Sequence, residues 1–166
     1  MKRIYTGSIE QLPRLALSVR QPWAHAIVSD WKDIENRKWS TAIKGPICIH
    51  ASAFNKRNYE QDREDYLEVL HLHVNPLGAP TMEQTSLDGI GFGAIVGIAT
   101  IVDCVTRCDS PWFFGPFGFV LKDQQILAEP IPVKGALGFF EWRHRLNNPS
   151  PAPVASHDNA QEELFL

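Results

Sequence analysis

The chain has 166 residues, of which 44% are hydrophobic and 21% are charged, with a formal net charge of −3. This length and composition are typical of one soluble globular domain with a sizeable core. The negative net charge argues against an indiscriminate nucleic-acid binder. No apolar stretch approaches the roughly 18 residues that a membrane-spanning helix needs, so no membrane partner is expected.

The three cysteines, Cys48, Cys104 and Cys108, are an odd number without the paired pattern of a disulfide framework. The first residues are basic but are not followed by the apolar core of a secretory signal. We therefore expect a cytoplasmic protein in a reducing compartment.

Charge is distributed unevenly along the chain. Residues 1–57 contain ten Lys and Arg against four Asp and Glu, whereas residues 58–166 contain six against fifteen. This asymmetry predicts an anion-binding face on the N-terminal third. An ordinary surface of mixed charge is the alternative.

The first half of the chain alternates apolar and turn-forming segments. Residues 1–12 are predicted to be a loose lead-in, followed by a strand at Leu15–Val19. Apolar residues then recur at helical spacing from about Gln21 to Trp31, with a proline suited to a first helical turn. Two further strands are predicted, one over 33–37 and one over Ile47–Ala51.

The second half begins with a predicted surface helix over 55–73, which carries a narrow apolar stripe. We interpret its acidic cluster as a solvated face; the members are Glu60, Asp62, Glu64, Asp65 and Glu68. The rest of the prediction comprises a loop over 75–89, strands over 93–105, 118–121 and 137–142, and a proline-rich connector over 129–132. Residues 147–166 are predicted to be a disordered tail. The predicted class is mainly β with helices (α+β), as a small barrel over residues 13–146.

One segment combines tryptophans with cations. Within 25 residues lie three tryptophans and five basic side chains: Trp23, Trp31, Trp39, Arg20, Lys32, Arg37, Lys38 and Lys44. Aromatic rings stack on unpaired bases and cations neutralise phosphates, so the segment indicates binding of single-stranded or flipped-out nucleotides. Trp23 and Trp39 are the candidates for stacking, with core packing as the alternative for each, and Trp31 is assigned to the core.

Several motifs occur in the order found in one known family. They include Leu17-Ser-Val-Arg-Gln-Pro-Trp-Ala24, Ile34-Glu-Asn-Arg37, Ile49-His-Ala-Ser52, Gly115-Pro-Phe-Gly-Phe119 and Lys134-Gly-Ala-Leu-Gly-Phe-Phe140. Together they resemble the ASCH domain of the PUA-like superfamily, over about residues 14–142. The resemblance implies a PUA-like β-barrel with a helix after the first strand, a helical insert, and a positively charged cleft beside the first helix. It also implies a role with RNA or modified nucleotides.

The core signature of that family is Gly-x-Lys-x-x-Glu-x-Arg. This chain has Lys32, Glu35 and Arg37 at the matching positions, and Asp30 at the position of the glycine. Aspartate tolerates the left-handed backbone conformation better than most residues. Some family members resemble hydrolases: one branch has ribonuclease activity, and another is an amidohydrolase that acts on N4-acetylcytidine. The amidohydrolase branch carries a threonine nucleophile at the position that matches Glu35 of this chain. Because Glu35 cannot act as a hydroxyl nucleophile, that activity does not transfer whole to this chain.

The extended segment around this signature places Glu35 and Arg37 on one face, with Ile34 directed inward. Glu35 could then accept a hydrogen bond from an exocyclic amine while Arg37 binds phosphate oxygens. The alternative is an internal ion pair that fixes the corner between helix and strand. If the protein is a hydrolase, the catalytic candidates are Lys32 and Glu35.

The remaining candidates extend the binding site. The predicted nucleic-acid-binding set is Arg20, Gln21, Trp23, Arg37, Trp39, His50, Ser52 and Lys134. In a hydrolase, Lys134 could act as a base or stabilise an oxyanion, with His50 or Ser52 assisting. His50 and Ser52, two residues apart on one strand, do not by themselves make a nucleophile–base pair. No metal or other cofactor is expected, since the cysteine and histidine spacings lack the second half of a zinc site.

The end of the chain carries a separate signal. Gln161-Glu-Glu-Leu-Phe165 is similar to the peptide with which bacterial replication proteins bind the sliding clamp.

Taken as a whole, the sequence favours a module that binds RNA or a modified nucleotide. A metal-independent hydrolase acting on the same ligand and an adaptor acting through the tail are the alternatives.

Overall fold

The computed structural model describes residues 3–73 and 91–146. The elements are, in order, η1 (Ile9–Gln11), β1 (Leu15–Val19), α1 (Trp23–Val28), β2 (Ile34–Arg37), β3 (Gly45–Ala51), α2 (Lys56–His73), β4 (Ala94–Val105), β5 (Phe117–Pro132), β6 (Phe139–Glu141) and η3 (Trp142–Arg145). The predicted loop over 75–89, the predicted tail over 147–166 and its clamp-like peptide lie outside the described residues.

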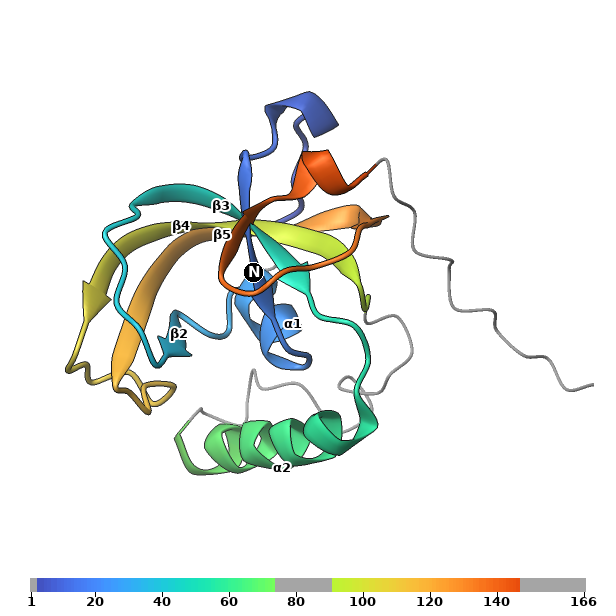
Figure 1. Ribbon diagram of the computed structural model, residues 1–166. Helices are drawn as coiled ribbons and strands as arrows, with labels where there is room; N and C mark the ends of the chain where they lie inside the picture. Colours follow the sequence, from blue (N-terminus) through green and yellow to red (C-terminus); the bar gives the residue numbers. More distant parts are fainter. Residues whose placement is uncertain (1–2, 74–90, 147–166) are drawn as a thin grey trace, which may run out of the picture.

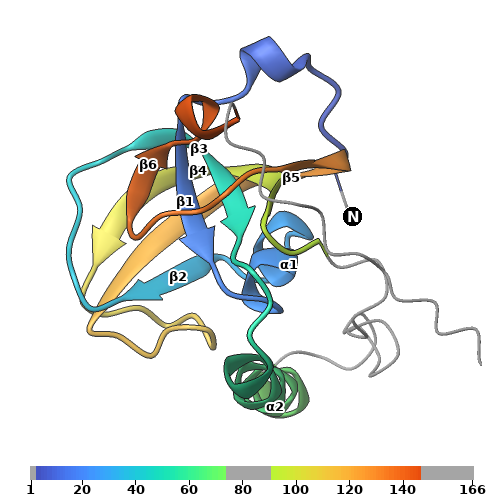
Figure 2. The ribbon, with the colours of Figure 1, turned by 45° about the vertical axis from the view of Figure 1, so that its right-hand side comes forward.

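The strands form one six-stranded sheet in the order β2-β5-β4-β3-β1-β6. β1 is parallel to β3, and the other pairs are antiparallel. The sheet curves strongly around α1, and α2 lies apart from it on the side of α1 (Figures 1 and 2). The predicted class, mainly β with helices, is confirmed. β2 and β6 end the sheet without pairing to each other, so the described strands form a half-barrel.

The main core lies between the sheet and α1. Strand alternation directs Leu17 and Val19 of β1 to this core, together with Ile27 and Val28 of α1. Gly97 of β4 permits the close approach, because a Cβ at this position would lie 2.3 Å from the Gln125 carbonyl oxygen and 2.5 Å from a Val28 methyl group. The helix therefore packs directly on the backbone of the sheet.

Helix α1 is shorter than its sequence pattern predicts. It ends at Val28 rather than Trp31, because Asp30 has a left-handed φ of 63° that stops the helix. The backbone N–H groups of Trp31 and Lys32 then both donate to the Ala26 carbonyl. This turn sets the direction in which the chain enters β2.

Strand β5 is longer than predicted, and the prediction of a connector over 129–132 is wrong. β5 continues to Pro132, which pairs with Ala94 of β4. β2 pairs only with residues 117–120 of β5, so Pro130 and Pro132 lie beyond that pairing. A strand segment that is paired on one side alone tolerates prolines, because a proline whose nitrogen faces the unpaired side removes no hydrogen bond of the sheet.

The predicted lead-in over residues 1–12 makes several contacts with the rest of the domain. The Tyr5 N–H donates to the Ile126 carbonyl at 2.8 Å, and Leu12 is only 4% exposed. The Arg143 guanidinium donates to the carbonyls of Ile9 and Leu12 at 2.8 and 2.9 Å. These bonds connect the first residues to β5 and η3.

Two further features bear on partners. No helix in the described part of the chain is long and apolar enough to cross a membrane.

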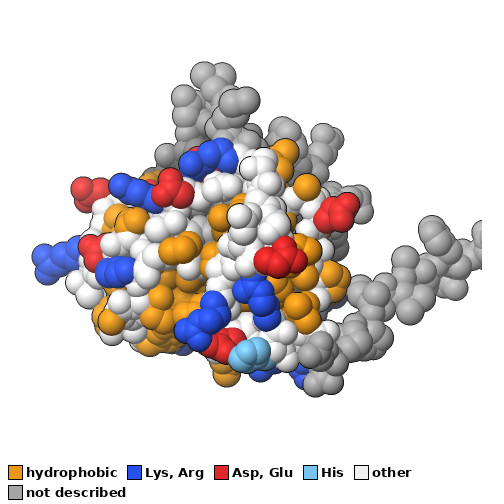
Figure 3. Space-filling model, turned by 90° about the horizontal axis from the view of Figure 1, so that it is seen from above, with side chains coloured by type: hydrophobic (Ala, Val, Ile, Leu, Met, Phe, Trp, Pro, Cys, Tyr) orange, Lys and Arg blue, Asp and Glu red, His pale blue; other side chains and the backbone are white. Residues whose placement is uncertain are grey.

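The face opposite α2 carries acidic and basic side chains interspersed with hydrophobic ones (Figure 3). The described residues on that face therefore form no continuous basic surface of the kind that binds a nucleic-acid backbone.

Candidate functional site

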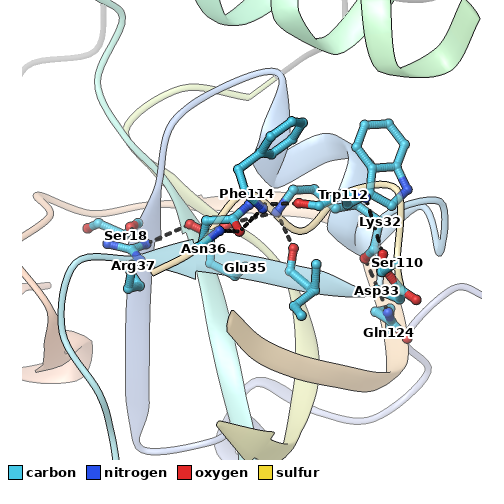
Figure 4. Close-up of polar contacts among 12 residues, drawn as sticks. Ser18, Lys32, Asp33, Glu35, Asn36, Arg37, Ser110, Trp112, Phe114 and Gln124 are labelled. Atoms are coloured by element: carbon cyan, nitrogen blue, oxygen red, sulfur yellow. Dashed lines mark hydrogen bonds and ion pairs between the residues drawn. The ribbon is translucent and has the colours of Figure 1, made fainter. Parts of the chain in front are cut away.

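β2 and the turn before it bring Lys32, Glu35 and Arg37 together (Figure 4). Glu35 Oε2 accepts from Lys32 Nζ at 2.8 Å, and Glu35 Oε1 is 3.0 Å from Arg37 Nη2. Glu35 and Arg37 share a face of the strand because they are two residues apart, whereas Ile34 is fully buried in the hydrophobic core. The sequence-based placement of these side chains is confirmed, and they form the ion pairs that the alternative interpretation described.

The Lys32 ammonium is unusually enclosed for a lysine. The residue is 2% exposed, and Nζ also donates to the Ile34 carbonyl. It lies 5.7 Å from the centre of the Trp23 ring. An ammonium has three N–H donors, and two acceptors for them, the Ile34 carbonyl and Glu35 Oε2, occur among the described residues.

Arg37 links β2 to β1. Its Nη2 donates to the Ser18 carbonyl at 2.6 Å, and its guanidinium lies 5.9 Å from the centre of the Trp39 ring. Its Nε is buried and has no hydrogen-bond partner among the described residues. Glu35 and the Ser18 carbonyl therefore hold Arg37 in place, but its donors are not all used.

These side chains line a cavity of about 620 Å³ between β1, β2 and α2. The lining residues are Ser18, Val19, Arg20, Trp23, Lys32, Glu35, Asn36, Arg37, Asp62, Asp65, Glu68 and Phe114. Five sequence-predicted residues are among them: Arg20, Trp23, Lys32, Glu35 and Arg37. The predicted residues Gln21, Trp39, His50, Ser52 and Lys134 do not line it.

Helix α2 supplies an acidic wall that the sequence analysis missed. Asp62 is 4% exposed, and its Oδ1 pairs with Arg20 Nη2 at 3.1 Å. The interpretation of the acidic cluster as a solvated face is therefore wrong for Asp62. With Asp65 and Glu68 also present, the described lining carries three cations and four carboxylates, so its charge is mixed rather than predominantly positive.

Burial raises the pKa of the Asp62 carboxyl above its usual value. The Arg20 guanidinium and the Trp23 side chain oppose this shift, while the negative charges of Asp65 and Glu35 add to it. Asp62 Oδ2 is buried without a hydrogen-bond partner among the described residues. Asp62 is therefore a buried carboxylate whose ion pair with Arg20 is made through Oδ1.

Phe114 is a second residue that the sequence analysis missed. It lines the cavity although its own surface is 66% exposed. Asn36 fixes its position, because Asn36 Oδ1 accepts from the Phe114 N–H at 2.8 Å and Asn36 Nδ2 donates to the Trp112 carbonyl at 2.8 Å (Figure 4). The aromatic run from Trp112 to Phe114 was a visible signal, but the sequence does not show that Asn36 binds it.

His50 pairs with Ser18 and not with Ser52. His50 Nε2 lies 2.9 Å from the Val133 carbonyl, which can only accept, so Nε2 carries the proton. Nδ1 is then the acceptor for the Ser18 hydroxyl at 3.0 Å. Burial lowers the pKa of the His50 imidazole, the Val133 carbonyl opposes this, and the positive charge of Arg145 lowers it further.

This lowered pKa predicts a loss of stability in mild acid. As the pH falls below about 6.5, the unfolded chain gains a proton at His50 that the folded protein does not accept. The free energy of unfolding should therefore fall by up to about 1.4 kcal/mol per pH unit until the lowered folded-state pKa is reached. We expect His50→Gln to lose this contribution when urea unfolding is compared at pH 7.5 and 5.5.

The matched control is His144→Gln, because the His144 side chain is 77% exposed. It should keep the pH dependence of the wild type. Equal pH dependence in the wild type and His50→Gln would contradict the prediction.

The other predicted residues lie elsewhere. Gln21 is buried, where it donates to the Gly91 carbonyl and accepts from the His25 N–H. Trp39 is 37% exposed and packs edge-on against Phe119 and Phe139. Ser52 is half-buried and Lys134 is exposed. The described residues contain no group of three or more potential metal ligands.

The fold and the site together define a class: an α+β half-barrel with a charged cavity between its first helix–strand corner and an inserted helix. The chain belongs to the ASCH domain family, which matches residues 17–143. It is 28% identical over 127 residues to activating signal cointegrator 1 of Homo sapiens and 26% identical to that of Mus musculus. These matches cover 72% of this chain but 20% of each relative, so the chain spans about a fifth of their length.

A solved structure also matches. The crystal structure of ASCH from Zymomonas mobilis aligns with a TM-score of 0.44 and 16% identity. The alignment covers 77% of this chain and 85% of that one.

Proposed function

We propose that this domain binds one nucleoside of an RNA strand, or a free modified nucleoside, in the cavity between β2 and α2. The observation that carries the proposal is the lining of this cavity, where aromatic rings occur beside charged hydrogen-bonding groups. Its volume of about 620 Å³ is in the usual range for small-molecule sites. Membership of the ASCH family supports the same ligand class.

The mixed charge indicates how such a ligand would be oriented. A phosphate inside the cavity would face four carboxylates, so the uncharged base is the better occupant. Trp23 and Phe114 offer ring surfaces, and base stacking contributes about 1–3 kcal/mol per base. Arg20, whose side chain is 55% exposed, can contact the backbone of a strand outside the cavity.

Phe114→Ala tests the proposal directly. Because Phe114 is mostly exposed, the substitution should leave the free energy of unfolding nearly unchanged. Loss of stacking should weaken binding about 5- to 150-fold. We expect this change in the Kd of nucleosides and short single-stranded RNAs, measured by isothermal titration calorimetry.

The matched control is Leu137→Ala, since Leu137 is 99% exposed and does not line the cavity. Its Kd should equal that of the wild type. The proposal is overturned if Phe114→Ala and Leu137→Ala bind equally well, or if the wild type binds no nucleoside and no RNA.

We propose binding rather than hydrolysis. Both Glu35 carboxylate oxygens are occupied by cations, which disfavours a role as general base, and no hydroxyl occurs at position 35. Incubation with RNA and with N4-acetylcytidine in EDTA should therefore give no product. Product formed by the wild type but not by Lys32→Met would favour the metal-independent hydrolase instead.

A further inference from the structure

Trp39 is a large aromatic residue that stays partly exposed just after β2. It is 37% exposed, although it packs against two phenylalanines. Its ring centre lies 5.1 Å from that of Phe119 and 5.6 Å from that of Phe139, at interplanar angles of 70° and 79°. None of the described rings therefore stacks in parallel on the Trp39 indole. An exposed ring with this environment is typical of the platforms on which unpaired bases stack.

Arg37 connects this indole to the cavity. Arg37 lines the cavity, and its guanidinium carbon lies 5.9 Å from the centre of the Trp39 ring. This distance is near the limit of about 6 Å for a cation–π contact. Glu35 and the Ser18 carbonyl hold the guanidinium in place through Nη2 (Figure 4). The cavity and the Trp39 indole are therefore neighbours that share one fixed cation.

The charges of the two cavity walls favour this side for a phosphate. On the β2 wall, Lys32 and Arg37 share the single carboxylate of Glu35, which leaves a net positive charge. The α2 wall contributes three carboxylates to the lining, those of Asp62, Asp65 and Glu68. A phosphodiester next to the cavity is attracted to the β2 wall and repelled by the α2 wall. The Arg37 side chain is still 18% exposed.

We propose that Trp39 is a second base-stacking site, so that the domain binds two adjacent nucleotides of a single strand. One base occupies the cavity, the neighbouring base stacks on the Trp39 indole, and the phosphodiester between them lies at Arg37. This inference rests on the proposed function, because it requires a base in the cavity. It also gives Trp39 a role in binding although Trp39 does not line the cavity.

The experiment compares ligands that add one part at a time. The Kd values of the four nucleosides, their 3′- and 5′-monophosphates, and the dinucleotides ApA, CpC, GpG and UpU are measured by calorimetry with the full chain. The monophosphates add the charge without the second base. Because stacking contributes about 1–3 kcal/mol per base, we expect a dinucleotide to bind at least about 5-fold more tightly than the corresponding monophosphates.

Trp39→Ala should remove this gain and leave the Kd of the nucleosides unchanged. Trp39→Leu is the second variant, because leucine keeps apolar packing against Phe119 and Phe139 but has no flat ring. It should lose the gain as Trp39→Ala does, and urea unfolding shows that each variant is folded. Phe54→Ala is the matched control, since Phe54 is a 49% exposed aromatic residue that does not line the cavity and packs against Tyr59 and Phe92. It should keep the gain of the wild type.

The outcomes separate the two proposals. The inference is overturned, and the proposed function left intact, if dinucleotides bind no more tightly than monophosphates or if the gain survives in the folded Trp39 variants. A Trp39 variant that loses nucleoside binding as strongly as dinucleotide binding also overturns it, because Trp39 would then act through the cavity alone. Wild-type protein that binds none of these ligands and no RNA overturns both.

Discussion

Replacing Glu35 with alanine should lower the free energy of unfolding by about 3–5 kcal/mol, because it leaves a buried cation without its partner. The Lys32 ammonium is 2% exposed and would retain only the Ile34 carbonyl as an acceptor. Arg37 would lose the carboxylate that lies 3.0 Å from its guanidinium. The loss is a large share of the 5–15 kcal/mol that stabilises a typical domain. It is measured by urea unfolding followed through tryptophan fluorescence.

A double-mutant cycle identifies the cause. If the cost arises from the unpaired ammonium, Lys32→Met should recover part of it when combined with Glu35→Ala. The double variant should then be more stable than the sum of the single effects predicts, by about 1–3 kcal/mol. Glu60→Ala on the exposed side of α2 should change stability by less than about 0.5 kcal/mol. Additive effects of Lys32→Met and Glu35→Ala would show that the buried pair is not the source.

The sequence was sufficient to predict that Glu35 and Arg37 share a face, with their ion pair as the alternative to ligand binding, because the geometry is local. Lys32, Glu35 and Arg37 lie within six residues, and the period of an extended strand alone places Glu35 and Arg37 on one face. The same locality explains why β1, β2 and β3 were predicted close to their observed bounds. Patterns of apolar residues in a short segment contain that information.

The other half of the cavity depends on contacts between distant segments. The burial of Asp62 arises where α2 meets Arg20 and the aromatic residues near α1, which no pattern within α2 shows. Phe114 is positioned by Asn36, 78 residues earlier in the chain. Likewise, the Ser18–His50 pair forms because β1 is parallel to β3, with Ser18 opposite His50. Each of these contacts requires the topology of the sheet before it can be predicted.

The packing of the Tyr66 ring fixes the position of α2, which forms one wall of the proposed site. The ring is fully buried, 5.7 Å from the centre of the Trp112 ring and 5.6 Å from that of the Trp23 ring. Trp23 belongs to α1, so this aromatic cluster joins α2 to α1 and to the loop before β5. Since α2 contributes one wall of the cavity, the cluster also determines where Asp62 lies.

Tyr66→Ala should therefore destabilise the protein by about 3–5 kcal/mol and abolish nucleoside binding. Hydrogen exchange should become faster in α2 than in the strands, because the helix loses its buried anchor before the sheet unfolds. Tyr66→Phe is the matched control. The Tyr66 hydroxyl is buried without a partner among the described residues, and burial raises the pKa of its phenol. Removing it should leave stability unchanged or raise it by about 1 kcal/mol, with binding intact. If Tyr66→Phe loses binding as Tyr66→Ala does, the ring packing does not account for the position of α2.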